Sequence, residues 1–251
     1  MMAGRFPSVW VVIVVYNNSD DTADCLRSLE SATWENRMVI LVDNGSSDGS
    51  GGRLRAEFPT VHHIRSEENL GFAAGCNLGI REALDARADY ICLLNNDTIV
   101  EPGFIDPLVI RAKADSRAGI IGGKIFYDQP GDIIWFAGGN IDRRTGFTTH
   151  RGQDRPDAPS YGEPLTVDYI TGCLFFVPAA IFNELGLLDE RLFMYCEELD
   201  FCLRARRAGY KCVYEPGSVI RHRVSRSICG ACRPLLSLSP PDHSLETYCV
   251  P

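Results

Sequence analysis

The sequence lacks a long apolar run, and this bears on where the protein works. Its longest such run is "VWVVIVVY" at residues 9–16, far shorter than the ~20 residues that a membrane-spanning helix needs. The opening "MMAGRFPS" has neither the apolar stretch nor the cleavage site of a secretory signal peptide. We therefore expect a cytoplasmic protein, and peripheral contact with the inner face of the membrane stays open.

The sequence also lacks an excess of positive charge. It has 25 Lys and Arg against 33 Asp and Glu, a net charge of −8, which argues against a nucleic-acid partner. Apolar residues make up 45% and charged residues 23% of the 251 residues, as in a soluble globular protein with a sizeable core. This length suits one large domain or two small ones.

Ten cysteines are present, but they do not form a recognisable framework. Most lie inside apolar or helical patterns, where a free thiol packs as a small hydrophobe, and disulfides are not expected without an export signal. Cys229 and Cys232, in "CGAC", have the spacing of a metal or redox pair. A zinc ribbon needs a second such pair, and only Cys249 follows, so a zinc site there is not favoured.

The first half of the chain alternates strand patterns with helical patterns. Apolar strand patterns occupy residues 9–15, 38–44, 61–65 and 89–94. Helical patterns lie between them, the first beginning at Asn18 or Ser19 and the third covering residues 71–86. This alternation predicts an α/β fold, in which a mostly parallel sheet has helices on both faces.

The second half is less regular. Residues 128–164 are rich in Gly, Pro, Asp and Arg, with a hairpin-like "IIWFAGGNIDRRTGF", and look like an excursion from the core, as binding loops often are. The flanking patterns predict helices at 104–114, 179–185 and 197–208, strands at 118–127 and 167–177, and two short strands in "KCVYEPGSVIRH". Residues 229–251 show no periodicity and are expected to form an irregular tail, which could reflect a truncation or an altered C-terminus.

Polar side chains follow the predicted parallel strands where each strand ends. Tyr16 and Asn17 follow the first strand, Asp43 and Asn44 end the second, and Asn95-Asn96-Asp97 follow the fourth. Ligands of open α/β sheets bind outside the carboxyl ends of the strands. The three strand ends are therefore expected to form one site.

Two of these groups allow a second interpretation. Asp43 could accept hydrogen bonds from a nucleotide base or ribose, or belong to the turn chemistry of "DNGSSDG". Asn95 and Asp97 would point the same way in an extended chain and could bind Mg²⁺ or Mn²⁺ if a diphosphate supplied further oxygens. The alternative for these residues is helix capping ahead of Pro102.

Three later features are equally open. Asn69 could cap the helix that begins near Gly71 or touch a ligand, and the glycines spaced four apart in that helix favour close packing on the sheet. The acids at 197, 198 and 200 suit a helix N-terminus, but clustered carboxylates raise one another's pKa and can supply a general base. His222 is a lone histidine after a short strand, and such residues are usually structural.

Taken in order, these segments resemble the family two glycosyltransferases, especially the bacterial branch with rhamnosyltransferases and galactofuranosyltransferases. The resemblance rests on "VVIVVYNN", "LVDNGSSDGS", "ENLGFAAGCNLGI", "LLNNDTIVEPGF", "DYITGCLFFV", "LDERLFMYCEELDFCLRARRAGY" and "VIRHRVSRS", and spans roughly residues 9 to 227. It implies a GT-A fold within residues 1–228. A Rossmann-like nucleotide-sugar-binding half at about 9–115 would join a smaller acceptor-binding half at 116–228.

The resemblance also implies a role for each matching residue. Tyr16, Asn17, Asp43, Asn69, Asn77 and Asn96 would bind the donor. Asn95, Asp97 and His222 would hold a divalent cation, Mn²⁺ or Mg²⁺, although the family's metal motif begins with Asp where this chain has Asn95. Glu198 would be the catalytic base, and Glu197, Asp200 and Arg204 would serve the acceptor site.

The expected function is an inverting, metal-dependent transfer of a sugar from a nucleotide-diphosphate donor to a glycan or lipid-linked acceptor in cell-surface polysaccharide synthesis. We favour dTDP-rhamnose as donor, with UDP-sugars next. One alternative is a nucleotide-sugar-binding module without turnover. Another is a sugar nucleotidyltransferase, but that needs a basic, Gly-rich loop after the first strand, where "YNNSDD" is acidic. Glycoside hydrolysis also uses two carboxylates, but needs neither a nucleotide pocket nor a metal.

Overall fold

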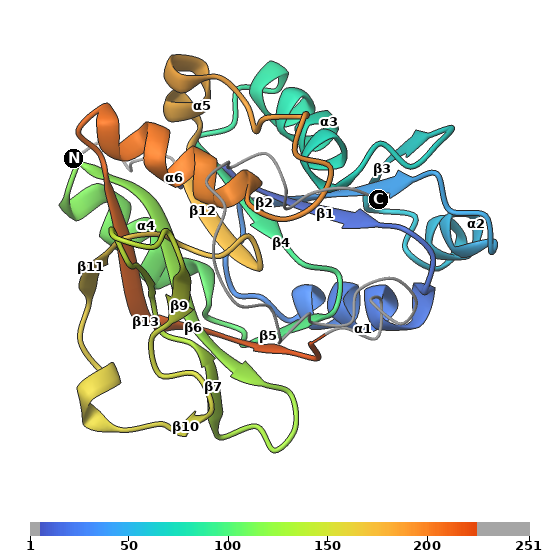
Figure 1. The fold of residues 1–251 in the computed structure, drawn as a ribbon. Helices are drawn as coiled ribbons and strands as arrows, with labels where there is room; N and C mark the ends of the chain where they lie inside the picture. The colour runs from blue at the N-terminus through green and yellow to red at the C-terminus, as the bar shows by residue number, and fades with distance from the viewer. Residues whose placement is uncertain (1–5, 225–251) are drawn as a thin grey trace, which may run out of the picture.

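The first half of the chain folds as alternating strands and helices. The computed structural model describes residues 6–224. The elements in order are β1 (Val9–Val15), α1 (Ser19–Glu30), β2 (Arg37–Asn44), α2 (Ser50–Glu57), β3 (His62–Ser66), α3 (Phe72–Asp85) and β4 (Tyr90–Leu94). The four strands are parallel in the order β4-β1-β2-β3. Figure 1 shows α1 on one face of this sheet and α3 on the other, which confirms the predicted layers.

Glycines allow α3 to lie close to the sheet. A Cβ at Gly79 would sit 2.4 Å from Val12 Cγ1 on β1, and one at Gly75 would sit 3.0 Å from Val14 Cγ1. Gly71 has a φ of 85°, which a side chain rarely adopts. Gly75 and Gly79 therefore serve helix-to-sheet packing, whereas a Cβ at Gly71 would meet Phe193.

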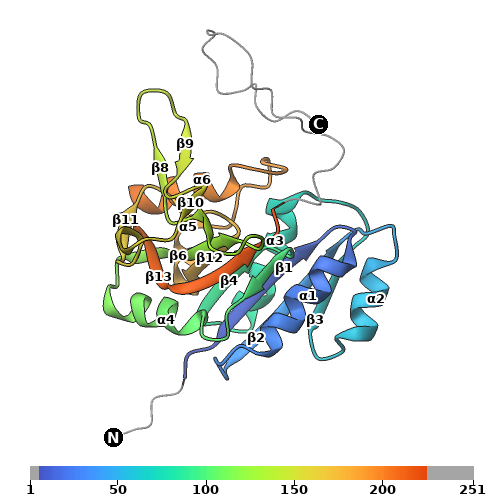
Figure 2. The same cartoon turned by 90° about the horizontal axis from the view of Figure 1, so that it is seen from below.

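The second half continues the same sheet. Its elements are β5 (Thr98–Val100), α4 (Ile105–Ala114), β6 (Ala118–Tyr127), β7 (Ile133–Phe136), β8 (Gly139–Ile141), β9 (Thr148–His150), β10 (Arg155–Pro156), a 3₁₀ turn (Pro159–Tyr161), β11 (Leu165–Val167), β12 (Leu174–Pro178), α5 (Ala179–Leu185), α6 (Glu197–Arg207) and β13 (Lys211–His222). β12 pairs antiparallel with β4 and with β6. The main path of the sheet is therefore β10-β7-β6-β12-β4-β1-β2-β3, while β8 and β9 form a separate hairpin that projects from the body (Figure 2).

Two predictions about strands in this half are wrong in detail. The segment 211–222 is one strand that pairs in parallel with β6, with a register shift between Glu215 and Val219. A proline in that interval has no N–H for the ladder, so the chain bulges there instead of ending the strand. The strand expected at 167–177 is interrupted between β11 and β12, where Thr171, Gly172 and Cys173 line a cleft.

β13 brings the end of the described chain back to the segment that follows β4. It pairs antiparallel with β5, so that His222 lies opposite Thr98. Within residues 6–224, the structure has no helix long and apolar enough to cross a membrane. The expectations for Cys229, Cys232 and the tail 229–251 fall outside these residues.

Candidate active site

A cleft of about 430 Å³ opens at the carboxyl ends of β1, β2 and β4. Its other walls come from β13, the excursion after β6 and the loop before α6. The structure therefore joins strand ends that are far apart in sequence, as the α/β pattern predicts. The predicted site residues that line the cleft are Tyr16, Asn69, Asn95, Asn96, Asp97, Glu197, Glu198 and His222.

Asp97 and His222 form a buried pair in this cleft. His222 Nε2 lies 3.1 Å from Asp97 Oδ1, and both side chains are less than a tenth exposed. The pairing of β13 with β5 brings the two residues together, and the Arg223 amide donates to the Asp97 carbonyl at 3.0 Å. The chain turns at Asn96 and Asp97 instead of staying extended, and Asn96 Nδ2 donates to Thr22 Oγ1 on α1 at 2.9 Å.

The Asp97–His222 pair fits one edge of a divalent-cation site. Adjacent ligands of an octahedral ion with ~2.1 Å bonds lie ~3 Å apart, close to the observed 3.1 Å. In the part of the chain that the structure describes, no group of three or more His, Cys, Asp or Glu residues could hold a metal. A cation here would therefore need oxygens from a ligand and from water, as Mg²⁺ commonly does when it binds a diphosphate.

Glu197 and Glu198 form the second titratable pair of the cleft. They open α6 directly after Tyr195 and Cys196, whose φ angles are 72° and 69°. Each glutamate has a buried Oε2 without a hydrogen-bond partner among residues 6–224. Burial, and then the neighbouring Glu198 charge, raise the pKa of Glu197 to about 8, and burial raises the pKa of Glu198.

This carboxyl pair can hold one proton at neutral pH. Two carboxylates side by side in a poorly solvated site repel each other, so one stays protonated while its neighbour is ionised. The ionised member is then a carboxylate of raised proton affinity that faces the cleft. Such a group can accept a proton from a bound hydroxyl.

Asn69 lines the cleft and also stabilises the loop before α3 through its hydrogen bonds. Its Oδ1 accepts hydrogen bonds from the Gly71 amide and from Asn44 Nδ2, both at 3.0 Å. Asn44 Oδ1 in turn accepts from the Leu70 amide at 3.2 Å. Both interpretations of Asn69, a support for the start of α3 and a ligand-facing residue, are therefore compatible with its position.

Asn17 and Asp43 lie next to the cleft but do not line it. Asn17 N donates to Ser46 Oγ at 2.8 Å, and the Ser46 amide donates to Asp43 Oδ1 at 2.9 Å. Asp43 also forms an ion pair with Arg65. These contacts tie the end of β1 to the loop after β2.

Asn77, Asp200 and Arg204 are not brought into the cleft. Asn77 bonds both the amide and the carbonyl of Leu188, and Arg204 bonds the carbonyls of Leu185 and Leu187. The predicted Asp200–Arg204 pair forms at 2.7 Å. The structure gives these residues roles in packing the segment between α5 and α6, and their contact with a substrate stays a prediction from the sequence.

The excursion 128–164 supplies cleft residues that sequence reasoning missed. Trp135 and His150 both line the cleft, and the Trp135 ring packs edge-on against His222 at 4.5 Å and His150 at 4.6 Å. Burial lowers the pKa of His150. The available signal was the aromatic run "IIWF" inside a Gly-rich loop, since such loops often carry binding residues.

Comparison with known proteins gives the family of this chain. Residues 10–179 match the model of "Glycosyl transferase family 2", and the chain belongs to that family. A relative in Mycobacterium tuberculosis (strain H37Rv), an N-acetylglucosaminyl-diphospho-decaprenol L-rhamnosyltransferase, is 30% identical over 239 residues, covering 86% of this chain and 76% of the relative. The dTDP-rhamnosyl transferase RfbF of Shigella flexneri is 26% identical, covering 92% of this chain and 75% of its own length. The rhamnosyltransferase-like resemblance is thereby confirmed.

A solved structure shows the same fold. The crystal structure of GalNAc-T7 with UDP, GalNAc and Mn²⁺ matches with a TM-score of 0.68 at 19% identity, and the match covers 87% of this chain but only 44% of that chain. At this identity the likeness establishes the GT-A fold alone. The fold class expected from the sequence is confirmed.

Proposed function

We propose that this chain is an inverting, metal-dependent glycosyltransferase that moves a sugar from a nucleotide-diphosphate donor to an acceptor hydroxyl. The observation that carries the proposal is the placement of two polar pairs in one cleft. Asp97 and His222 lie at the strand ends, and Glu197 and Glu198 lie on the wall formed by α6. The first pair suits a cation with a diphosphate, and the second suits a hydroxyl that must lose its proton.

Each pair would act on a different part of the reaction. Asp97 and His222, with Asn95 as the third predicted ligand, would hold the cation, which neutralises charge on the departing diphosphate when it is bound. Glu198 would accept the proton of the acceptor hydroxyl while that oxygen forms its bond to the anomeric carbon and the diphosphate oxygen leaves from the opposite face. One displacement of this kind inverts the configuration at that carbon.

The donor would extend from the cation pair toward the ends of β1 and β2. Tyr16, Asn69 and Asn96 line this part of the cleft, and we place the base and ribose near Asn17 and Asp43. Trp135 and Phe72 also line the cleft, and we expect them to offer apolar surface for the sugar. Glu197 would share its proton with Glu198 and contact the acceptor.

Rhamnose is the sugar that we favour, with dTDP-rhamnose as donor. Two relatives carry rhamnosyl transfer in their names, and one of those names includes a diphospho-decaprenol acceptor. We therefore place the chain in the synthesis of a cell-surface polysaccharide, with a glycan or lipid-linked acceptor. UDP-sugars are the second candidate donors, and Mn²⁺ and Mg²⁺ are the candidate cations.

The variant Glu198→Gln tests the assignment of the base. It should lower transfer of rhamnose from dTDP-rhamnose by about 10²–10⁴-fold, while dTDP binding measured by calorimetry stays within about twofold, because the base acts only on the acceptor. The exposed Glu67→Gln is the matched control and should transfer like the wild type. Equal transfer by Glu198→Gln and wild type would remove Glu198 from the mechanism, and dTDP binding without transfer by the wild type would favour a binding module.

A further inference from the structure

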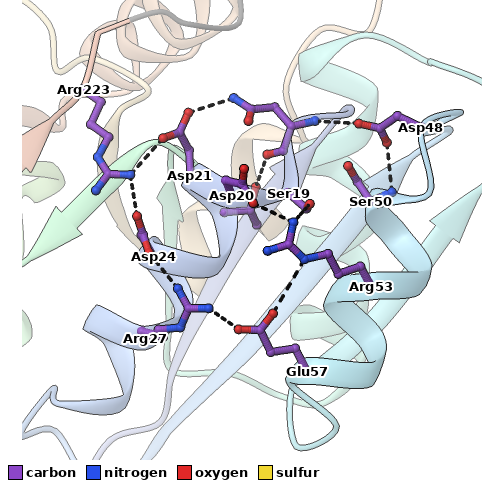
Figure 3. Close-up of polar contacts among 12 residues, drawn as sticks. Ser19, Asp20, Asp21, Asp24, Arg27, Asp48, Ser50, Arg53, Glu57 and Arg223 are labelled. Carbon is purple, nitrogen blue, oxygen red and sulfur yellow. Dashed lines mark hydrogen bonds and ion pairs between the residues drawn. The ribbon is translucent and has the colours of Figure 1, made fainter.

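Arg223 follows His222 directly and connects the end of β13 to helix α1. Its Nη1 lies 2.7 Å from Asp24 Oδ2 and 2.9 Å from Asp21 Oδ1, and its Nε lies 3.3 Å from Asp128 Oδ2. Figure 3 shows the guanidinium pointing between Asp21 and Asp24 on α1. Three carboxylates from two segments of the chain therefore surround one cation.

The network continues beyond these contacts into α2. Asp24 also pairs with Arg27, Arg27 pairs with Glu57, and Arg53 pairs with Asp20 (Figure 3). Most of these outer pairs are exposed, and exposed pairs contribute little each. Arg223 differs because its side chain is a quarter exposed and Asp21 is only 5% exposed. The contacts of Arg223 with Asp21 and Asp24 are therefore the part of the network that can fix the position of the backbone at the end of β13.

Helix α1 also contacts the turn that carries Asp97, the other residue of the proposed cation pair. Thr22 Oγ1 accepts the hydrogen bond from Asn96, and Cys25 Sγ lies 3.6 Å from Thr98 Oγ1. Asp97 lies between these two anchored residues. The first turns of α1 therefore touch the turn that carries Asp97, and through Arg223 they touch the strand end that carries His222.

The backbone ladder of β13 ends at His222. The last ladder contacts of β13 are the pairings of His222 with Thr98 and with Tyr127. Two backbone hydrogen bonds follow, from Asp128 N to His222 O at 2.9 Å and from Arg223 N to Asp97 O at 3.0 Å. Strand ends are the places where ladders open first, so a side-chain anchor at this position restrains the backbone that aims His222.

We propose that Arg223 is a positioning residue that keeps His222 beside Asp97 by binding Asp21 and Asp24 on α1. The inference rests on the proposed function, because a cation held by Asp97 and His222 is what would make this placement matter. Arg223 does not line the cleft, so it acts through His222. Residues that orient metal ligands typically change metal affinity about 10–100-fold when they are replaced.

The test measures Mn²⁺ binding by electron paramagnetic resonance in three variants with dTDP present. Arg223→Met should weaken Mn²⁺ binding by about 10–100-fold, while dTDP binding without metal stays within about twofold. Arg223→Lys keeps the charge but cannot reach three carboxylates at once, so it should lie between Arg223→Met and wild type. Arg221→Met is the matched control, because Arg221 lies on the same strand but bonds Gly131 and Glu101, and it should bind Mn²⁺ like the wild type.

Two results would overturn the inference. One is a folded Arg223→Met variant with wild-type Mn²⁺ affinity, and the other is an equal loss in Arg221→Met, which would indicate general destabilisation. If Arg223→Met does not fold, the double variant Asp21→Ala and Asp24→Ala removes the same contacts from α1 and should show the same loss of Mn²⁺ affinity. Wild-type Mn²⁺ affinity in a folded double variant would equally overturn the inference.

Hydrogen exchange separates this inference from the proposed function. The backbone amide of residue 223 donates to Asp97 O. If the Arg223 side chain anchors this strand end, that amide should exchange faster in Arg223→Met than in Arg221→Met, whether or not a metal binds. If the wild type binds no Mn²⁺ but the two variants differ in exchange as expected, the cation site is refuted and the anchoring of β13 stands. Unchanged exchange at this amide would refute the anchoring itself.

Discussion

Replacing Glu197 with glutamine should change how stability depends on pH. The Glu197 residue is 4% exposed, and burial with the adjacent Glu198 raises its pKa from 4.5 to about 8. Between these two values the native protein holds a proton that the unfolded chain has released. The free energy of unfolding should therefore fall as pH rises through this window, by up to about 1.4 kcal/mol per pH unit for one proton.

The expected size of the effect follows from this window. The glutamine side chain of Glu197→Gln cannot ionise. Between pH 5 and pH 8 the free energy of unfolding should therefore fall by up to about 4 kcal/mol less in the variant than in the wild type. Glutamine can still donate a hydrogen bond to Glu198, so the contact between the two side chains is retained. The half-buried His150 titrates in both proteins, and its contribution cancels in the difference.

Urea unfolding followed by circular dichroism at pH 5, 6, 7 and 8 measures this difference. The exposed Glu67→Gln is the control and should give a curve parallel to that of the wild type. Parallel curves for Glu197→Gln and wild type would refute the argument that burial keeps this carboxyl protonated. The shared-proton account of the glutamate pair would then fail.

Two further substitutions test how the fold supports the cleft. Gly79→Ala should lower the free energy of unfolding by about 1–3 kcal/mol because its Cβ would meet Val12, whereas Gly52→Ala, with open space around it, should raise the free energy by up to about 1 kcal/mol. Equal effects in urea unfolding would exclude close packing as the reason for Gly79. Asn77→Ala removes the hydrogen bonds to Leu188 and should lower the free energy of unfolding by about 1–3 kcal/mol. The exposed Asn140→Ala is the control and should change it little. A stability of Asn77→Ala equal to that of the wild type would show that Asn77 is not a packing residue.

Elements with a strong local pattern were predictable from the sequence. β1 is an unbroken run of Val, Ile and Trp, and α3 repeats its apolar residues at helical spacing, so each is recognisable without its neighbours. The sequence predicts two strands where β13 forms one, because Pro216 and Gly217 interrupt the pattern, although pairing with β6 carries the strand across the bulge. Tertiary pairing decides such cases, and a local pattern does not contain it.

The cleft was predictable where it consists of strand ends and not where it depends on contacts between distant segments. Asn95 to Asp97 follow a recognisable strand, and topology places them near Tyr16. Trp135 lies in the short strand β7, inside a Gly-rich segment without clear periodicity, so nothing local indicated that it would meet His222. Arg223 lies 202 positions from Asp21 in the chain, and only the finished sheet brings them together.

Calorimetric titration of dTDP into the protein, with and without Mn²⁺, tests the central claim most directly. The account predicts that Mn²⁺ tightens dTDP binding to the wild type and that Asp97→Ala loses this gain while keeping its metal-free affinity. UDP in place of dTDP would then show which base the cleft prefers. A cooperatively folded wild-type protein that binds neither nucleotide, or binds them equally with and without Mn²⁺, would contradict the metal-dependent donor site.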